Sequence, residues 1–186
     1  MPDHTPTPDT GGDYNPRDYP AVAVTVDIVM FTIVDAELKV LLIQRGTPPF
    51  LGQWALPGGF IHPDEDLADA ARRELAEETG IHQDPGHLEQ FGSYGDPDRD
   101  PRMRVVTVGF WAIVSDLPTP AGGSDARNAE LVAVSEVESG RIRLAFDHAT
   151  ILADALETAR SKLESTTLAA AFCGPEFTVS DLRKVY

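Results

Sequence analysis

The chain has 186 residues, of which 15 are Lys or Arg and 30 are Asp or Glu, so its formal net charge is −15. This balance argues against a protein that binds nucleic acid over its whole surface, although a local site for an anionic ligand is compatible with it. The single cysteine, Cys173, excludes an intrachain disulfide. No run of about 18–20 uncharged apolar residues predicts a membrane-spanning helix, and the N-terminus lacks a signal-peptide pattern. We therefore expect a cytoplasmic protein without membrane association.

The first third of the chain predicts a polar lead, two strands and a shaped loop. Residues 1–19 are rich in proline and poor in aliphatic side chains, which is typical of a flexible segment. Residues 21–34 and 37–45 are rich in β-branched and aliphatic residues and predict a hairpin of two strands. The glycines and prolines of 46–60 exclude a long regular element there, so these residues predict a loop.

The remaining elements predict a mixed fold of strands and helices. A helix is expected at 65–79, with Asp64 as its N-cap and Gly80 just past its end. The polar, turn-rich segment 91–104 predicts a loop. Further along the chain, residues 105–114 predict a strand and residues 130–139 predict a short strand. The stretch that begins at Asp147 has the pattern of an amphipathic helix. Strands on both sides of a helix, followed by a second long helix, favour an α/β sandwich.

Three glutamates, Glu74, Glu77 and Glu78, stand close together at the end of the 65–79 helix. Carboxylates are disfavoured there because a helix C-terminus carries partial negative charge, and Glu74 and Glu78 are also like charges four residues apart. On a helical wheel the three fall within an arc of about 100°. A solvated acidic face is the alternative, but no lysine stands where an ion-pair partner would. We therefore expect them to bind a divalent cation such as Mg²⁺ or Mn²⁺, which in turn predicts a phosphate-bearing substrate.

The segment GFIHPDEDLADAARRELAEETGI, residues 59–81, resembles the Nudix box, G-x5-E-x7-R-E-U-x-E-E-x-G-U, where U is aliphatic. Nine fixed positions of the pattern are filled, by Gly59, Glu65, Arg73, Glu74, Leu75, Glu77, Glu78, Gly80 and Ile81. The resemblance implies a Nudix-type α/β/α sandwich with a mixed β-sheet. It also implies hydrolysis of a nucleoside diphosphate linked to another moiety.

The resemblance assigns roles to residues of the box. It implies that Glu74, Glu77 and Glu78, together with the carbonyl of Gly59, bind Mg²⁺, with Mn²⁺ as the alternative metal. Arg73 is expected to belong to the catalytic set by orienting the glutamates through charge-assisted hydrogen bonds. Glu65 is expected to form a supporting salt bridge rather than to bind the metal.

The general base is not fixed by the box. The candidates are Glu77 and three acids outside the box, Asp96, Asp98 and Glu130. His148, beside an aspartate at a predicted helix start, is interpreted as a residue of the cap region rather than as a catalytic base.

Five residues outside the box are candidates for contact with the substrate. Arg45, Arg102 and Arg104 could bind phosphate or ribose, and an ordinary surface arginine is the alternative for each. Trp54 and Phe50 could stack on an adenine ring, but an anchoring role for the 46–60 loop is favoured for both.

Two further segments, 44–60 and 91–114, resemble the Nudix subgroup tied to ADP-ribose and NAD metabolism. The subgroup includes ADP-ribose pyrophosphatases, which yield AMP and ribose 5-phosphate, and ADP-ribose-sensing transcriptional regulators with a winged-helix domain. The intact box favours the hydrolase, and a Nudix hydrolase for another nucleotide is a further alternative. We assign 20–172 to the Nudix domain and 173–186 to a C-terminal segment that resembles the start of a winged helix. DNA binding by this chain alone is not expected, and a homodimer is expected by analogy.

Overall fold

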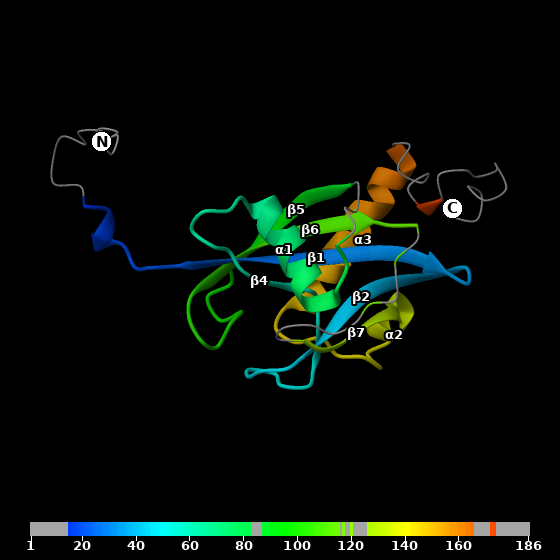
Figure 1. Cartoon of the computed structure of the whole chain (residues 1–186), viewed down its shortest axis with the longest axis horizontal. Helices are drawn as coiled ribbons and strands as arrows, with labels where there is room; N and C mark the ends of the chain where they lie inside the picture. The colour runs from blue at the N-terminus through cyan, green and yellow to red at the C-terminus, as the bar shows by residue number, and fades with distance from the viewer. Residues whose placement is uncertain are drawn as a thin grey trace.

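The computed structural model describes residues 15–82, 87–115, 117, 120, 126–165 and 172–173. In these ranges the elements follow the order η1 (Pro16–Asp18), β1 (Ala23–Val34), β2 (Glu37–Arg45), β3 (Trp54–Ala55), β4 (Gly58–Phe60), α1 (Leu67–Thr79), β5 (Leu88–Tyr94), β6 (Val105–Ile113), β7 (Ala126–Ala133), α2 (Val134–Glu138) and α3 (His148–Ser165) (Figure 1). Of the flexible lead expected at 1–19, the structure describes residues 15–19. The winged-helix segment expected at 173–186 lies, apart from Cys173, outside the described residues.

In the described part of the chain, seven strands form one sheet. Five of them follow the order β3-β2-β1-β6-β5, while β4 pairs with β1 and β7 pairs with β2. β1 and β6 run parallel along Ala23–Phe31, and the other pairs are antiparallel. The sheet is therefore mixed, as expected.

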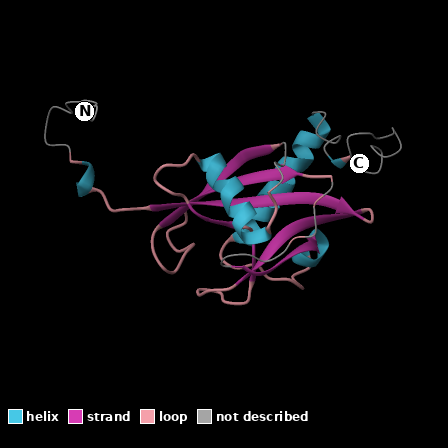
Figure 2. Ribbon diagram, in the orientation of Figure 1, coloured by secondary structure: helices cyan, strands magenta, loops and turns pink. Residues whose placement is uncertain are grey.

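The two long helices cover opposite faces of the sheet (Figure 2). Side chains along a strand alternate between its faces, and β1 shows this directly. Val26, Ile28 and Met30 pack with buried residues of α1, whereas Val29 and Phe31 pack with buried residues of α3. The result is a three-layer α/β/α sandwich, which confirms the expected fold class. Among the described helices, none is both long enough and apolar enough to cross a membrane.

The start of α1 differs from the sequence-based expectation. The N-cap is Asp66 rather than Asp64, because Asp66 has an extended backbone and its carboxylate accepts a hydrogen bond from the Ala68 N–H. At the other end Gly80 adopts φ 70°, the left-handed conformation expected of a residue that terminates a helix. The box helix therefore runs from Leu67 to Thr79.

Two regions contain more regular secondary structure than the sequence predicts. One was expected to be a loop and the other a short strand. The predicted loop 91–104 begins inside β5, which runs to Tyr94 and contains a register shift between Gln90 and Gly92. The predicted short strand at 130–139 is the end of β7 followed directly by α2. In both regions pairing with a neighbouring strand decides the structure, since β5 pairs with β6 and β7 pairs with β2.

One edge of β1 changes partners along its length, and this positions the site. β4 pairs with Thr25–Asp27, whereas β2 pairs with Phe31–Val34. Because β2 diverges from the N-terminal half of β1, side chains from α1, from β1 and from the start of α3 can approach one another around β4. By the alternation along β1, Asp27 lies on the α3 face of the sheet.

Candidate active site

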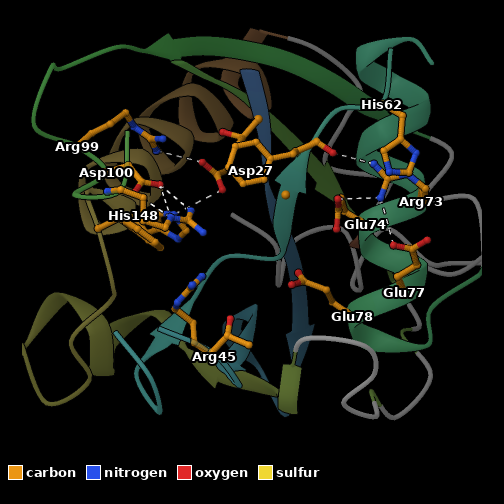
Figure 3. A pocket seen from close by; sticks show the side chains of 16 residues that line it. Asp27, Arg45, His62, Arg73, Glu74, Glu77, Glu78, Arg99, Asp100 and His148 are labelled. Carbon is orange, nitrogen blue, oxygen red and sulfur yellow. Dashed lines mark hydrogen bonds and ion pairs between the residues drawn. The ribbon is translucent and has the colours of Figure 1, made fainter. Parts of the chain in front are cut away.

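A cavity of about 360 Å³ lies between α1 and the start of α3 (Figure 3). Its α1 wall consists of Arg73, Glu74, Glu77 and Glu78, with Gly59 beside them. Its opposite wall, which we call the arginine wall, is formed by Asp27, Arg45, Arg99, Arg102 and His148. The cavity therefore places carboxylates on one side and guanidinium groups on the other, an arrangement suited to a ligand that carries both a cation and phosphates.

Arg73 organises the α1 wall. Its guanidinium donates hydrogen bonds to Glu65 at 2.6 and 2.9 Å, to Glu74 at 2.8 Å and to Glu77 at 3.2 Å. It also donates to the carbonyl of Phe60 at 3.0 Å, which joins the helix to β4. These charge-assisted bonds fix the orientation of Glu74 and Glu77, as expected for Arg73, and the salt bridge expected for Glu65 is present.

The carboxyl groups in this wall and beside it differ in the direction of their pKa shifts. The hydrogen bond from Arg73 lowers the pKa of Glu65 to about 2. Burial raises the pKa of Glu74, although Arg73 opposes that effect. Burial raises the pKa of Glu78 to about 8, and the single backbone hydrogen bond from Gly58 N–H, at 2.9 Å, does not offset it. Glu78 is thus a buried carboxyl group that a cation would stabilise in its charged form.

Gly59 lies directly against Glu74. A Cβ atom at Gly59 would come within 2.6 Å of the carboxyl carbon of Glu74, which is closer than real Cβ contacts allow. The absence of a side chain at Gly59 is therefore what lets the backbone of β4 and the carboxylate of Glu74 share the cavity edge.

The α1 wall fits a divalent cation by its donor chemistry. Carboxylate oxygens, with a backbone carbonyl such as that of Gly59, are the ligands that Mg²⁺ prefers. Within the described residues no three His, Cys, Asp or Glu side chains converge as a closed metal cluster, because Arg73 holds Glu74 and Glu77 while Glu78 is hydrogen-bonded to Gly58. The set is open, which suits a cation that also takes oxygens from phosphate and water.

The arginine wall contains a buried charge network. Arg99 contacts Asp147 at 2.7 and 2.9 Å and Asp27 at 3.3 Å, and its side chain is only 4% exposed. Burial works against the charged guanidinium, but the two carboxylates outweigh it and raise the pKa of Arg99. The network ties β1, the loop after β5 and the residue before α3 to one another.

His148 belongs to the same network. Its Nδ1 accepts a hydrogen bond from Leu56 N–H at 2.9 Å, and its Nε2 lies 3.5 Å from Asp27 Oδ1. Burial lowers the pKa of His148, so the ring is neutral at physiological pH and carries its proton on Nε2, toward Asp27. A ring with both nitrogens engaged in this way is a structural link rather than a base, as the sequence suggested.

Arg102 and Arg45 approach an aromatic ring from the arginine wall. Asp100 holds Arg102 through a bidentate pair at 3.0 and 2.7 Å. The Arg102 guanidinium lies 5.4 Å from the ring centre of Phe60 and 5.9 Å from that of Phe146, and Arg45 lies 4.8 Å from Phe146. Both arginines thus line the cavity while their guanidinium groups make cation–π contacts with aromatic rings.

Comparison with known proteins decides the family. Residues 24–155 match the NUDIX domain, and this range contains both walls of the cavity. The chain belongs to the Nudix family. The resemblance seen in the box is therefore confirmed, and so is the expectation of a Nudix pyrophosphohydrolase.

Both a repressor and a pyrophosphatase are found among the similar proteins. The ADPR responsive transcriptional repressor NtrR of Acinetobacter baylyi is 35% identical over 175 residues, which cover 93% of this chain and 68% of the repressor. The ADP-ribose pyrophosphatase of Methanocaldococcus jannaschii is 39% identical over 136 residues, which cover 73% of each chain. The solved NUDIX domain of Shewanella oneidensis NrtR, complexed with ADP ribose, has a TM-score of 0.71 and 37% identity, covering 79% of this chain and 94% of that one. The expected subgroup is confirmed.

Three of the five substrate-contact candidates reach a cavity of this Nudix domain and two do not. Arg45 and Arg102 line the cavity, and Phe50 lines a neighbouring one. Arg104 instead donates to the carbonyls of Asp96 and Val105, which ties the loop after β5 together. Trp54 packs against the core cluster on the α3 face, as the favoured loop-anchor interpretation predicts, and Phe50 also packs against a core cluster, which includes Ala55 and Ala145.

The candidates for the general base are also separated in space. Of the four, all of which lie in described residues, Glu77 lines the Nudix cavity. Asp96 and Asp98 line the neighbouring cavity instead, and Glu130 lies on β7 with its carboxylate bonded to Asn128. Glu77 is therefore the candidate that stands beside the expected metal and phosphates.

Sequence reasoning missed two residues of the arginine wall and two residues beside it. Asp27, Arg99 and Asp100 were not candidates, and neither was Phe146. One signal was present: Asp27 is an acid in the middle of a strand that is otherwise almost wholly apolar, and a buried charge there requires a partner. Its partner, Arg99, is 72 residues away, and no local pattern connects the two.

Proposed function

We propose that this Nudix protein hydrolyses ADP-ribose to AMP and ribose 5-phosphate in a reaction that needs Mg²⁺. The single observation that carries the proposal is the cavity whose α1 wall presents three glutamates to a facing wall with three arginines. Such an arrangement matches a metal-bound diphosphate, and the similarity to an ADP-ribose pyrophosphatase supplies the substrate class.

The proposed metal ligands are Glu74, Glu77, Glu78 and the carbonyl of Gly59. A bound Mg²⁺ would neutralise phosphate charge and lower the pKa of a bound water. Arg73 holds Glu74 and Glu77 in orientation, and Glu77, whose side chain is 49% exposed, can reach a water molecule and accept its proton.

The arginine wall has a separate part in the proposed reaction. Arg45 and Arg102 contribute positive charge opposite the glutamates, where the diphosphate would lie. Attack of water on one phosphorus breaks its bond to the bridging oxygen, and these guanidinium groups stabilise the charge that develops on the leaving phosphate. Asp100 fixes Arg102 in place, so little reorganisation is needed.

The decisive experiment is a substrate panel. Purified protein with Mg²⁺ is incubated separately with ADP-ribose, NAD, a dinucleoside polyphosphate, a nucleotide sugar and an oxidised nucleoside triphosphate, and products are separated by chromatography. We expect AMP and ribose 5-phosphate from ADP-ribose with the highest kcat/KM, and none when EDTA is present. Faster hydrolysis of another nucleotide would replace ADP-ribose as the substrate while keeping the family chemistry.

A second candidate function is an ADP-ribose sensor that controls DNA binding. It is favoured by the similarity to a repressor along 93% of this chain. Thermal stabilisation by ADP-ribose with no release of AMP would support the sensor over the hydrolase. A longer chain that continues past Tyr186 and retards promoter DNA only when ADP-ribose is absent would establish it.

A further inference from the structure

A second cavity, which we call the aromatic cavity, adjoins the candidate active site. Its volume is about 700 Å³, and its lining includes Phe50, Asp96, Asp98, Arg99 and Phe146. Arg99 and Phe146 also line the first cavity, so the two share a partition. A ligand whose diphosphate lies in the first cavity can therefore extend past Phe146 into the second.

Two phenylalanine rings meet in the aromatic cavity. The ring centres of Phe50 and Phe146 are 4.8 Å apart and the rings are inclined at 71°. Both residues have a left-handed backbone, with φ of 61° at Phe50 and 54° at Phe146. Bulky residues rarely adopt this conformation, and such strain is concentrated at functional sites, where the surrounding structure holds a side chain in one position.

The two cavities differ in the arrangement of their charged groups, since carboxylates face guanidinium groups in the first and aspartates predominate in the second. The aromatic cavity is lined by Asp96, Asp98 and Asp147, and the arginine that lines it in the described part of the chain, Arg99, is already bonded to Asp147 and Asp27. A phosphate is therefore disfavoured there, whereas a neutral planar ring is not. In the first cavity the arginine wall favours phosphate, and its rings at Phe60 and Phe146 are approached by guanidinium groups.

We propose that the aromatic cavity binds the nucleobase of the substrate, which stacks on Phe50 beside Phe146. This inference rests on the proposed function and deepens it, because it assigns the base and the diphosphate to different cavities. Phe50 determines affinity for the base and takes no part in bond cleavage.

The test compares two fragments of the substrate, AMP and ribose 5-phosphate, by isothermal titration with wild type and variants in the presence of Mg²⁺. The variant Phe50→Leu keeps an apolar side chain against Phe146 and removes the aromatic ring. We expect about 5- to 100-fold weaker AMP binding, unchanged ribose 5-phosphate binding, and recovery of AMP binding in Phe50→Tyr. Leu51→Ala is the matched control, since Leu51 is 49% exposed in the same loop and lines none of the cavities described above.

Three results would overturn the assignment of the base: no AMP binding by wild type, unchanged AMP binding by Phe50→Leu, or equal weakening of AMP and ribose 5-phosphate. Turnover separates this inference from the proposed function. If wild type releases no AMP from ADP-ribose while Phe50→Leu loses AMP binding, the hydrolase fails and the base site stands. If wild type does turn over ADP-ribose, Phe50→Leu should raise KM and leave kcat unchanged.

Discussion

The α1 wall and the arginine wall enclose the same cavity but are assembled in different ways. The α1 wall comes from one segment, and its hub, Arg73, reaches partners no more than 13 positions away in the sequence. The arginine wall joins residues as far apart as Asp27 and His148, and the side chains of Asp27, Arg99 and His148 are almost completely buried. The proposed chemistry thus belongs to a local, partly solvated motif, whereas its placement depends on a buried network of distant residues.

The largest expected effect tests whether the arginine wall is a structural framework. Replacing Arg99 by methionine leaves Asp27 and Asp147 without their guanidinium partner, and Asp27 is only 8% exposed. We expect a loss of about 3–5 kcal/mol in the free energy of unfolding, as for a broken buried pair. The measurement is urea denaturation.

The matched control for this substitution is Arg141→Met. Arg141 is 75% exposed and lies 3.8 Å from Glu136, so its loss should change stability by less than about 0.5 kcal/mol. If Arg99→Met unfolds at the same urea concentration as wild type, the network does not hold the wall together.

The second effect concerns catalysis by the α1 wall. Glu77→Gln keeps the size of the side chain but removes its charge and its capacity to accept a proton. For an ADP-ribose hydrolase we expect kcat to fall by about a hundredfold to a thousandfold, with an unchanged urea midpoint because Glu77 is half exposed. Glu130→Gln, a sequence-based candidate that lies outside the cavity, should retain wild-type turnover. Equal activity of Glu77→Gln and wild type would remove Glu77 from the mechanism.

A third, smaller effect tests Arg73, which holds the glutamates of the α1 wall in orientation. Arg73→Lys keeps the positive charge but cannot bond Glu65, Glu74 and Glu77 at once, because an ammonium group lacks the planar fork of a guanidinium. We expect the Mg²⁺ concentration for half-maximal activity to rise by about tenfold to a hundredfold. The adjacent Arg72→Lys is the control, since Arg72 is exposed and contacts Asp69 at 3.4 Å. The same Mg²⁺ dependence in both variants would show that orientation by Arg73 is unimportant.

Per unit of pH, the smallest effect is a pH dependence of stability in the absence of divalent cations. The folded pKa of Glu78 is about 8, against an ordinary value of 4.5, so between these pH values the folded state retains a proton that the unfolded chain releases. Stability should therefore fall as pH rises through this window, by at most about 1.4 kcal/mol per pH unit.

Glu78→Gln removes this titration and provides the test. Its stability relative to wild type should increase from pH 5 to pH 8, as measured by urea midpoints in EDTA. Parallel pH profiles for the two proteins would show that burial does not perturb Glu78.

The sequence by itself predicted the parts that depend on neighbours along the chain. The strand 37–45 is found as Glu37–Arg45, and the box places Arg73 beside Glu77 because residues four positions apart in a helix lie on one face. The N-cap was misplaced by two residues, since Asp64 and Asp66 carry the same side chain and the backbone conformation decides between them.

The rest of the site depends on packing between segments that are far apart in the sequence. Asp27 meets Arg99 and His148 because β1 pairs with β6 and packs under α3, and no local pattern encodes that meeting. Arg45 and Trp54 lie in neighbouring, paired strands. In the folded protein, however, Arg45 lines the cavity and Trp54 packs against the core. The sequence thus determined which chemistry is present, because a motif is a set of short spacings. The fold determined which distant groups surround it, because burial and strand pairing act across the whole chain.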